Sequence, residues 1–143
     1  MLILLLPDQI AEKWGTLAKD VEESLPSIVG SPYNMNTILN ASLSGTLQYW
    51  MLKNENQENS GLIITTIYLD ISSGTSMLMI YAVITYKGSK LSDWKSAYAT
   101  LEKFARLKGC SGIMGFSNNE TIIKYMKHLE CEVDQRLIMW RLK

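Results

Sequence analysis

The sequence has 143 residues, enough for one ordinary domain that buries a sizeable core without a metal or a disulfide. Apolar residues make up 47% and charged residues 20%, a balance typical of a globular chain and not of a disordered one. Lysine plus arginine equals aspartate plus glutamate, at 14 each, so the overall basic character of many nucleic-acid-binding proteins is missing. We therefore expect one domain over residues 1–143, with no nucleic-acid signal beyond what a local basic patch would give.

The first apolar run, from Met1 to Leu6, is far too short to span a bilayer. No basic residue precedes it and Pro7 ends it, so it is a poor signal peptide and fits a short buried strand better. The two cysteines, Cys110 and Cys131, favour reduced thiols in a cytoplasm-like compartment. The sequence thus predicts a cytoplasmic protein without a membrane segment.

The next residues have the spacing of two helices and three strands. Asp8 is the expected N-cap of a first helix that stops at Pro26, and its buried stripe is Ile10, Trp14, Leu17, Val21 and Leu25. A loop rich in glycine, proline and serine precedes a shorter helix over Asn36 to Leu43, which Gly45 closes. Strands are expected over 47–52, 62–71 and 77–86, with a polar turn at 54–60 and a hairpin turn at 72–74.

A third helix is expected between Ser92, its predicted N-cap, and Gly109. A short strand over 111–116, a fourth helix capped by Asn118 or Asn119, and a final strand or tight hairpin over 133–142 follow. The predicted order is β-α-α-β-β-β-α-β-α-β. A meander followed by a strand–helix–strand unit implies an α/β (α+β) fold, with a mixed sheet and helices on both faces.

The segment from Asn119 to Glu132 reads Asn-Glu-Thr-Ile-Ile-Lys-Tyr-Met-Lys-His-Leu-Glu-Cys-Glu. Together with the element order, it resembles the GNAT superfamily of N-acetyltransferases, whose segment reads Asn-Glu-x-Ala-Ile-x-Leu-Tyr-x-Lys-Leu-Gly-Phe-Glu. The family's tyrosine, often the general acid on the leaving thiolate, falls on Met126, and a thioether has no proton to give. Tyr125 is adjacent but about 100° around the helix, so it replaces that acid only if the helix rotates or the register shifts.

The stretch from Tyr86 to Ser92, Tyr-Lys-Gly-Ser-Lys-Leu-Ser, resembles the family's acyl-CoA loop, commonly Tyr-Arg-Gly-Lys-Gly-Ile-Gly. Two glycines of that loop are replaced, and a Cβ at either position should crowd a phosphate and disfavour left-handed backbone angles. Lys90 offers a positive charge in exchange. The resemblance implies cofactor contacts at Lys87, Gly88, Ser89, Lys90 and Ser92.

Acetyl transfer also needs a base, or a held water, to take a proton from the attacking amine. The strand over 77–86 contains no carboxylate, so Asp70 and Glu120 are the remaining candidates. Because both the cofactor loop and the proton donor are altered, the resemblance implies a catalytically degenerate GNAT-like pseudoenzyme that uses no cofactor and acts through protein–protein contacts. A divergent acyl-CoA-dependent N-acetyltransferase, using acetyl-CoA, is the alternative.

Two other stretches, Trp94 to Cys110 and Leu43 to Trp50, resemble small GNAT-like proteins encoded by tailed bacteriophages. This resemblance implies a viral source and a virion-associated or structural component. Its partners would be other virion proteins or a second copy of the chain, in the host cytoplasm or in the particle.

No metal site is expected. His128 is the only histidine, and with Cys110 and Cys131 it supplies three ligands where a structural zinc site usually needs four in a recognisable spacing. A surface histidine and two small apolar cysteines fit these residues better. The four tryptophans and the methionines of the central segment are likewise interpreted as core packing.

Overall fold

The computed structural model describes residues 1–25, 33–117, 120–128 and 130–133. A five-stranded sheet runs through the chain, and its strands lie side by side in the order β1-β2-β3-β4-β5. Neighbouring strands are antiparallel except β4 and β5, which are parallel. The elements are β1 (Leu2–Leu4), α1 (Pro7–Ser24), α2 (Met35–Leu43), β2 (Gln48–Lys53), β3 (Asn59–Leu69), β4 (Ser76–Thr85), α3 (Leu91–Leu107), β5 (Gly112–Gly115) and α4 (Glu120–His128).

The predicted order of elements is confirmed up to α4, and the sheet is mixed as expected. The predicted final strand over 133–142 lies almost wholly outside the described residues, as do the proposed Asn118 or Asn119 cap and the helix stop at Pro26. Observed and predicted boundaries of the shared strands differ by three residues at most.

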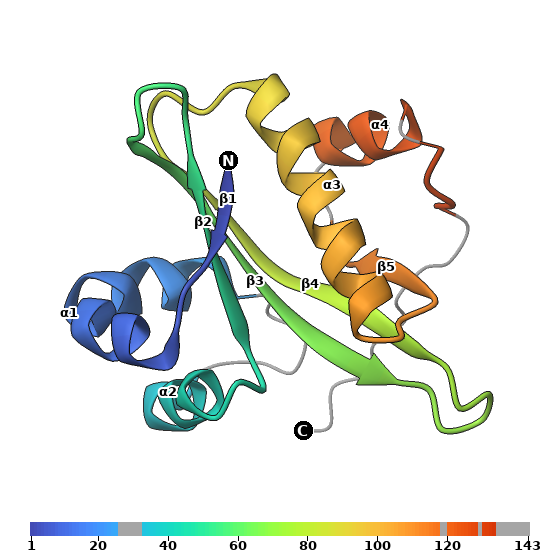
Figure 1. Cartoon of the computed structure of the whole chain (residues 1–143), viewed down its shortest axis with the longest axis horizontal. Coiled ribbons are helices and arrows are strands. Elements are labelled where there is room, and N and C mark those ends of the chain that lie inside the picture. Colours follow the sequence, from blue (N-terminus) through green and yellow to red (C-terminus); the bar gives the residue numbers. More distant parts are fainter. Residues whose placement is uncertain (26–32, 118–119, 129, 134–143) are drawn as a thin grey trace, which may run out of the picture.

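The sheet separates two apolar cores, because α1 and α2 cover one face and α3 covers the other (Figure 1). β2 shows how one strand serves both cores. Its alternate residues Tyr49 and Met51 pack toward α1, whereas Trp50 and Leu52 pack toward α3, and all four are buried. On the predicted stripe of α1, Ile10, Leu17, Val21 and Leu25 are buried, with Trp14 partly buried against them; the list is as expected.

α1 begins two residues earlier than the predicted N-cap Asp8 would place it. Leu6 is its N-cap, and Pro7 occupies the first helical position, where its missing N–H costs nothing. The side chain of Gln9 accepts a hydrogen bond from the Leu6 N–H at 2.8 Å. Asp8 therefore lies within the first turn and is not the N-cap. Its negative charge there interacts favourably with the positive end of the helix dipole.

β4 is irregular near its middle. Ile64 of β3 pairs with Ala82 and the next residue, Thr65, pairs with Ile80, so Tyr81 is an extra residue in β4 and forms a β-bulge. The parallel ladder with β5 ends at the same point, with the pair Ile80 and Gly115. β4 then continues to Thr85 without pairing to β5 and leads directly to the loop before α3.

Candidate functional site

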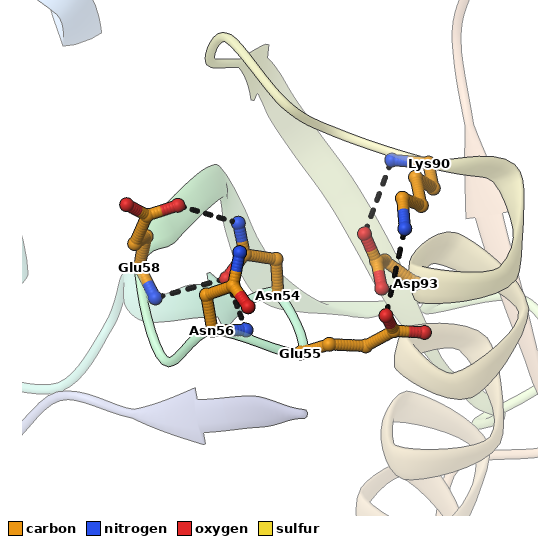
Figure 2. Close-up of polar contacts among 6 residues, drawn as sticks. All are labelled: Asn54, Glu55, Asn56, Glu58, Lys90 and Asp93. Carbon is orange, nitrogen blue, oxygen red and sulfur yellow. Dashed lines mark hydrogen bonds and ion pairs between the residues drawn. The ribbon is translucent and has the colours of Figure 1, made fainter.

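The loop from β4 to α3 lies beside the turn that joins β2 to β3, so residues far apart in the sequence meet at the N-terminus of α3 (Figure 2). Gly88 has a φ of 88°, a conformation that suits glycine, and a Cβ built there would lie 3.8 Å from the Asn54 side-chain nitrogen. The predicted cofactor residues from Lys87 to Ser92 form this loop and the start of α3.

Several backbone N–H groups of this loop already have partners within the protein. The Tyr86 N–H donates to the Ser60 carbonyl at 3.0 Å, and the Ser89 N–H donates to the Tyr86 carbonyl at 3.4 Å. The Lys90 N–H donates to the Asp93 carboxylate at 3.1 Å. A phosphate can recruit these N–H groups only if it breaks the bonds they now make.

Asp93 is the residue that caps α3. Its side chain is 7% exposed, and it reaches back from the third helical position to the N–H of the N-cap residue, Lys90. Ser92 was expected to be the N-cap, but it lies inside the first turn and is exposed, because the helix starts at Leu91. A carboxylate at this position is stabilised by the helix dipole and adds a negative charge to the helix terminus.

The ammonium group of Lys90 faces the β2–β3 turn. Its Nζ lies 3.5 Å from Oε2 of Glu55, and both side chains are well exposed, at 63% and 79%. An exposed pair of this kind adds little to stability. The pair does change the local charge. Lys90, which was expected to attract phosphate in place of a missing glycine, lies beside the Glu55 carboxylate (Figure 2).

The turn that carries Glu55 is held by its own hydrogen bonds. Oδ1 of Asn54 accepts from the N–H groups of Asn56 at 2.9 Å and Glu58 at 3.0 Å. Nδ2 of Asn54 donates to the Glu58 carboxylate at 3.1 Å. This turn therefore presents Glu55 toward α3, while the Glu58 carboxylate is paired within the turn (Figure 2).

Trp94 of α3 holds the loop between β4 and α3 in place. Its indole N–H donates to Oγ of Ser89 at 2.6 Å, so this predicted cofactor contact is used inside the protein. The ring lies against β3, where a Cβ added to Gly61 would be 3.0 Å from the indole and 3.0 Å from the Ile84 carbonyl oxygen. Only glycine allows this close approach without a shift.

Tyr86 points to the opposite face of the sheet and joins the loop to α1. Its hydroxyl donates to Asp20 at 3.0 Å beside a hollow of about 310 Å³. Burial, together with the hydrogen bond to Asp20 and the charge of that carboxylate, raises the pKa of Tyr86 to about 12. Tyr86 is thus a neutral hydrogen-bond donor that positions the loop at ordinary pH.

The candidate base Asp70 is not part of this site. It lies in the turn between β3 and β4, at the far end of the ten-residue strand β4, about 30 Å from the loop at 3.3 Å per residue. Its carboxylate accepts hydrogen bonds from the hydroxyls of Ser73 and Ser72 and from the Ser73 N–H. These bonds, that of the Ser73 hydroxyl first, lower the pKa of Asp70, which makes it a weaker base.

The other candidate catalytic residues are on α4. Glu120 is the exposed first residue of that helix. Tyr125 is within the same helix, but its side chain lies outside the described part of the structure. The candidate acid and bases are therefore not assembled around the loop by any contact among the described side chains.

Acetyl-CoA, which the family resemblance implies, requires a site for its pyrophosphate at this helix terminus. The residues present do not fit that group. Asp93 and Glu55 bring negative charge to the place where phosphate would bind, and the nearby N–H of Lys90 is already bonded. Neither carboxylate was predicted from the sequence to lie at this site. The spacing Lys90-x-x-Asp93 was a signal for a capping acid, whereas Glu55 is 35 residues away from Lys90 and gave no signal.

The described residues contain no group of three His, Cys, Asp or Glu side chains that could hold a metal ion. His128 is exposed, and the side chains of Cys110 and Cys131 are half-buried, less covered than a core position would be. None of the helices in the described ranges is both long and apolar enough to cross a membrane.

No protein-family model matches the sequence, and a search of curated proteins found no match. Solved structures do match along the whole chain. An aminoglycoside acetyltransferase from an uncultured soil metagenomic sample, in complex with sisomicin, has a TM-score of 0.72 at 10% identity, covering 100% of this chain and 95% of that one. The ribosomal-protein-alanine N-acetyltransferase of Brucella melitensis biovar Abortus 2308 gives 0.69 at 12% identity, covering 99% of both chains.

A GNAT family acetyltransferase of Staphylococcus aureus gives a TM-score of 0.63 at 18% identity, covering 99% of this chain and 98% of that one. At such low identity the similarity extends to the backbone arrangement and not to the chemistry of individual residues. The mixed sheet, its helices on both faces and these structural matches together establish that the chain has the fold of the GNAT acetyltransferases.

Proposed function

We propose that this chain is a GNAT-fold protein that does not transfer acetyl groups and that acts through contacts with other proteins. The observation that carries the proposal is the carboxylate of Asp93, which is buried at the N-terminus of α3 and bonded to the loop backbone. Helix N-termini bind phosphate through free N–H groups and a positive dipole. A terminus that holds its own carboxylate attracts a pyrophosphate less, because one N–H is already bonded and a negative charge already faces the dipole.

The β3–β4 hairpin supplies a surface for such contacts. Pairing between β2 and β3 reaches only to Gln48 and Thr65, so the outer part of β3 extends past β2 (Figure 1). Its exposed apolar side chains include Ile67 at 39%, Tyr68 at 45% and Leu69 at 56%, and Ile71 in the turn is 91% exposed. Successive side chains of a strand point to opposite faces, so apolar groups are exposed on both faces of this part of β3. Exposed apolar groups are one sign of a protein contact.

The finer part of the proposal is that the protein is a virion-associated or structural component of a tailed phage. Its support is the resemblance of the stretches 43–50 and 94–110 to small phage-encoded proteins. The partners would then be other virion proteins or a second copy of this chain, in the particle or in the host cytoplasm.

The test is the binding of acetyl-CoA and of CoA to the whole chain, followed by thermal unfolding and titration calorimetry. We expect no change in melting temperature up to millimolar ligand. A ligand at 100 times its Kd would stabilise the folded state by about 2.7 kcal/mol, which is several degrees for a chain of this size. A saturable shift of that kind would refute the proposal.

The second candidate is a divergent acyl-CoA-dependent N-acetyltransferase, and one feature of β4 favours it. The bulge at Tyr81 directly follows the end of the β4–β5 ladder at Ile80 and Gly115, so β4 continues beyond this point without pairing to β5. Phe116, which follows β5, is 47% exposed and is not buried between them. Release of free thiol from acetyl-CoA in the presence of a panel of amines, measured with a thiol reagent, would decide for this candidate.

A further inference from the structure

We propose that Asp93 and Glu55 act as built-in anions at the N-terminus of α3, so that the chain itself occupies the place a phosphate group would take. The inference deepens the proposed function, on which it rests, by naming the residues that exclude phosphate. The replacement of two glycines, which the sequence suggested as the cause, has the smaller effect.

The backbone angles argue against the glycines as the main cause. Lys90 replaces the first of them, and its φ of −115° and ψ of 154° are ordinary extended values that any residue adopts. Ser92 replaces the second and lies in the first turn of α3. The one positive φ in the loop is at Gly88, where the glycine is retained. Backbone strain therefore does not separate this loop from a glycine-rich one.

Asp93 is the inner anion. It is 7% exposed and bonded to the Lys90 N–H, so its charge is held within the first turn of the helix. A pyrophosphate approaching the same turn would meet a like charge at short range in a partly desolvated place, where repulsion is strong. It would also have to compete for the N–H that Asp93 now binds.

Glu55 is the outer anion, and it acts on Lys90. With Nζ of Lys90 3.5 Å from the Glu55 carboxylate, the lysine that would attract a phosphate already has a negative partner. The hydrogen bonds of Asn54 hold the turn in a shape that presents Glu55 to α3. The Glu55 carboxylate thus neutralises the Lys90 ammonium group, while the Asp93 carboxylate binds the Lys90 N–H (Figure 2).

The experiment uses the charge-removing variants Asp93→Asn and Glu55→Gln, alone and combined. Asparagine keeps a side-chain oxygen that can accept from the Lys90 N–H, so the cap survives while the charge is removed. Glu58→Gln is the matched control, because it removes a charge from the same turn at a carboxylate that pairs with Asn54 and not with α3. Binding of inorganic pyrophosphate is measured by calorimetry at low salt, and circular dichroism confirms folding.

We expect the double variant to bind pyrophosphate at least about tenfold more tightly than the unaltered chain, since a nearby unit charge is removed at each position. Each single variant should give part of the gain, and Glu58→Gln should give almost none. High salt should reduce the gain. Amide shifts at Leu91 and Ser92 in NMR spectra should locate the bound anion at this helix.

Two outcomes overturn the inference: a folded double variant that binds no better than the unaltered chain, or an equal gain from Glu58→Gln, which would indicate only an effect of net charge. If Asp93→Asn does not fold, the comparison of Glu55→Gln with Glu58→Gln decides alone. Failure of the proposed function is seen separately, as acetyl-CoA binding by the unaltered chain. The ratio of pyrophosphate affinities between variants does not depend on that result.

Discussion

Gly61 and Gly15 allow the packing under the candidate site to be tested by the same substitution in two surroundings. At Gly61 in β3, an alanine Cβ would lie 3.0 Å from the Trp94 ring and 3.0 Å from the backbone oxygen of Ile84. At Gly15 in α1, no atom outside the local helix lies within 4 Å of the added Cβ. Gly61→Ala therefore adds a methyl group to a contact that is already tight. Gly15→Ala replaces a poor helix former with a good one where the methyl group meets no neighbour.

The expected magnitudes have opposite signs. Overpacking at Gly61→Ala should destabilise the fold by about 1–3 kcal/mol, reduced slightly by the lower entropy of the unfolded chain. Gly15→Ala should stabilise α1 by up to about 1 kcal/mol. With an unfolding entropy of roughly 2.1 cal/mol/K per residue, the 143-residue chain changes its melting temperature by about 3 °C per kcal/mol. The two variants should therefore differ by roughly 3–12 °C.

The assay is urea unfolding followed by tryptophan fluorescence and circular dichroism, with melting temperatures as a second measure. Because Trp94 donates to Ser89, the Gly61→Ala variant should also change the environment of that indole and loosen the loop above it. A Gly61→Ala variant as stable as the unaltered chain would refute the close packing of Trp94 on β3. If Gly15→Ala also destabilised the fold, the loss at Gly61→Ala could not be assigned to the contact of residue 61 with Trp94 and Ile84.

Two further predictions concern buried polar groups. Thr65 is fully buried, accepts from the Trp50 indole N–H at 2.9 Å and donates to the Gln48 side chain at 3.0 Å; Thr65→Val should cost about 1–3 kcal/mol in urea unfolding, and much less in a W50F background if the indole bond is the cause. The pKa of Tyr86 is raised from 10.0 to about 12, so its stabilising effect is complete below pH 10 and is lost as the pH rises toward 12. Since Tyr86 is only half-buried, solvent screening limits the alkaline loss of unfolding free energy to about 1 kcal/mol. In Tyr86→Phe the unfolding free energy should no longer fall between pH 10 and 12. If the variant and the unaltered chain lose stability equally over this range, Tyr86 is not the group responsible.

Most of the fold could be predicted because its determinants are local. The spacing of Ile10, Leu17 and Val21 placed α1, and the apolar run of β4 placed the central strand. The caps were harder to predict, because several residues near each helix start could fill the role. Asp8 and Ser92 are both favourable capping residues by type, yet Pro7 and Asp93 decide where α1 and α3 begin.

The site was less predictable, in part because the contact of Lys90 with Glu55 joins segments that are far apart in the sequence. The comparison of residues 86–92 with a glycine-rich loop drew attention to missing glycines, but no periodicity shows that Glu55 reaches Lys90 or that Trp94 binds Ser89 across the loop. The surroundings of Asp70 are local instead. Ser72 and Ser73 belong to a turn that the sequence predicted, and both donate hydrogen bonds to the Asp70 carboxylate.

The arrangement also explains how the fold can persist while the terminus of α3 changes. The two apolar cores depend on the buried faces of α1, α3 and the sheet, and the loop residues from Lys87 to Lys90 contribute little to either. A carboxylate in the first turn stabilises a helix by about 0.3–1 kcal/mol, so under the proposal Asp93 supports α3 at the same place where it opposes phosphate. Polar sites often cost stability and are kept because function requires them. Under the proposed function no phosphate has to bind at this terminus, so Asp93 can stabilise α3 there without a functional cost.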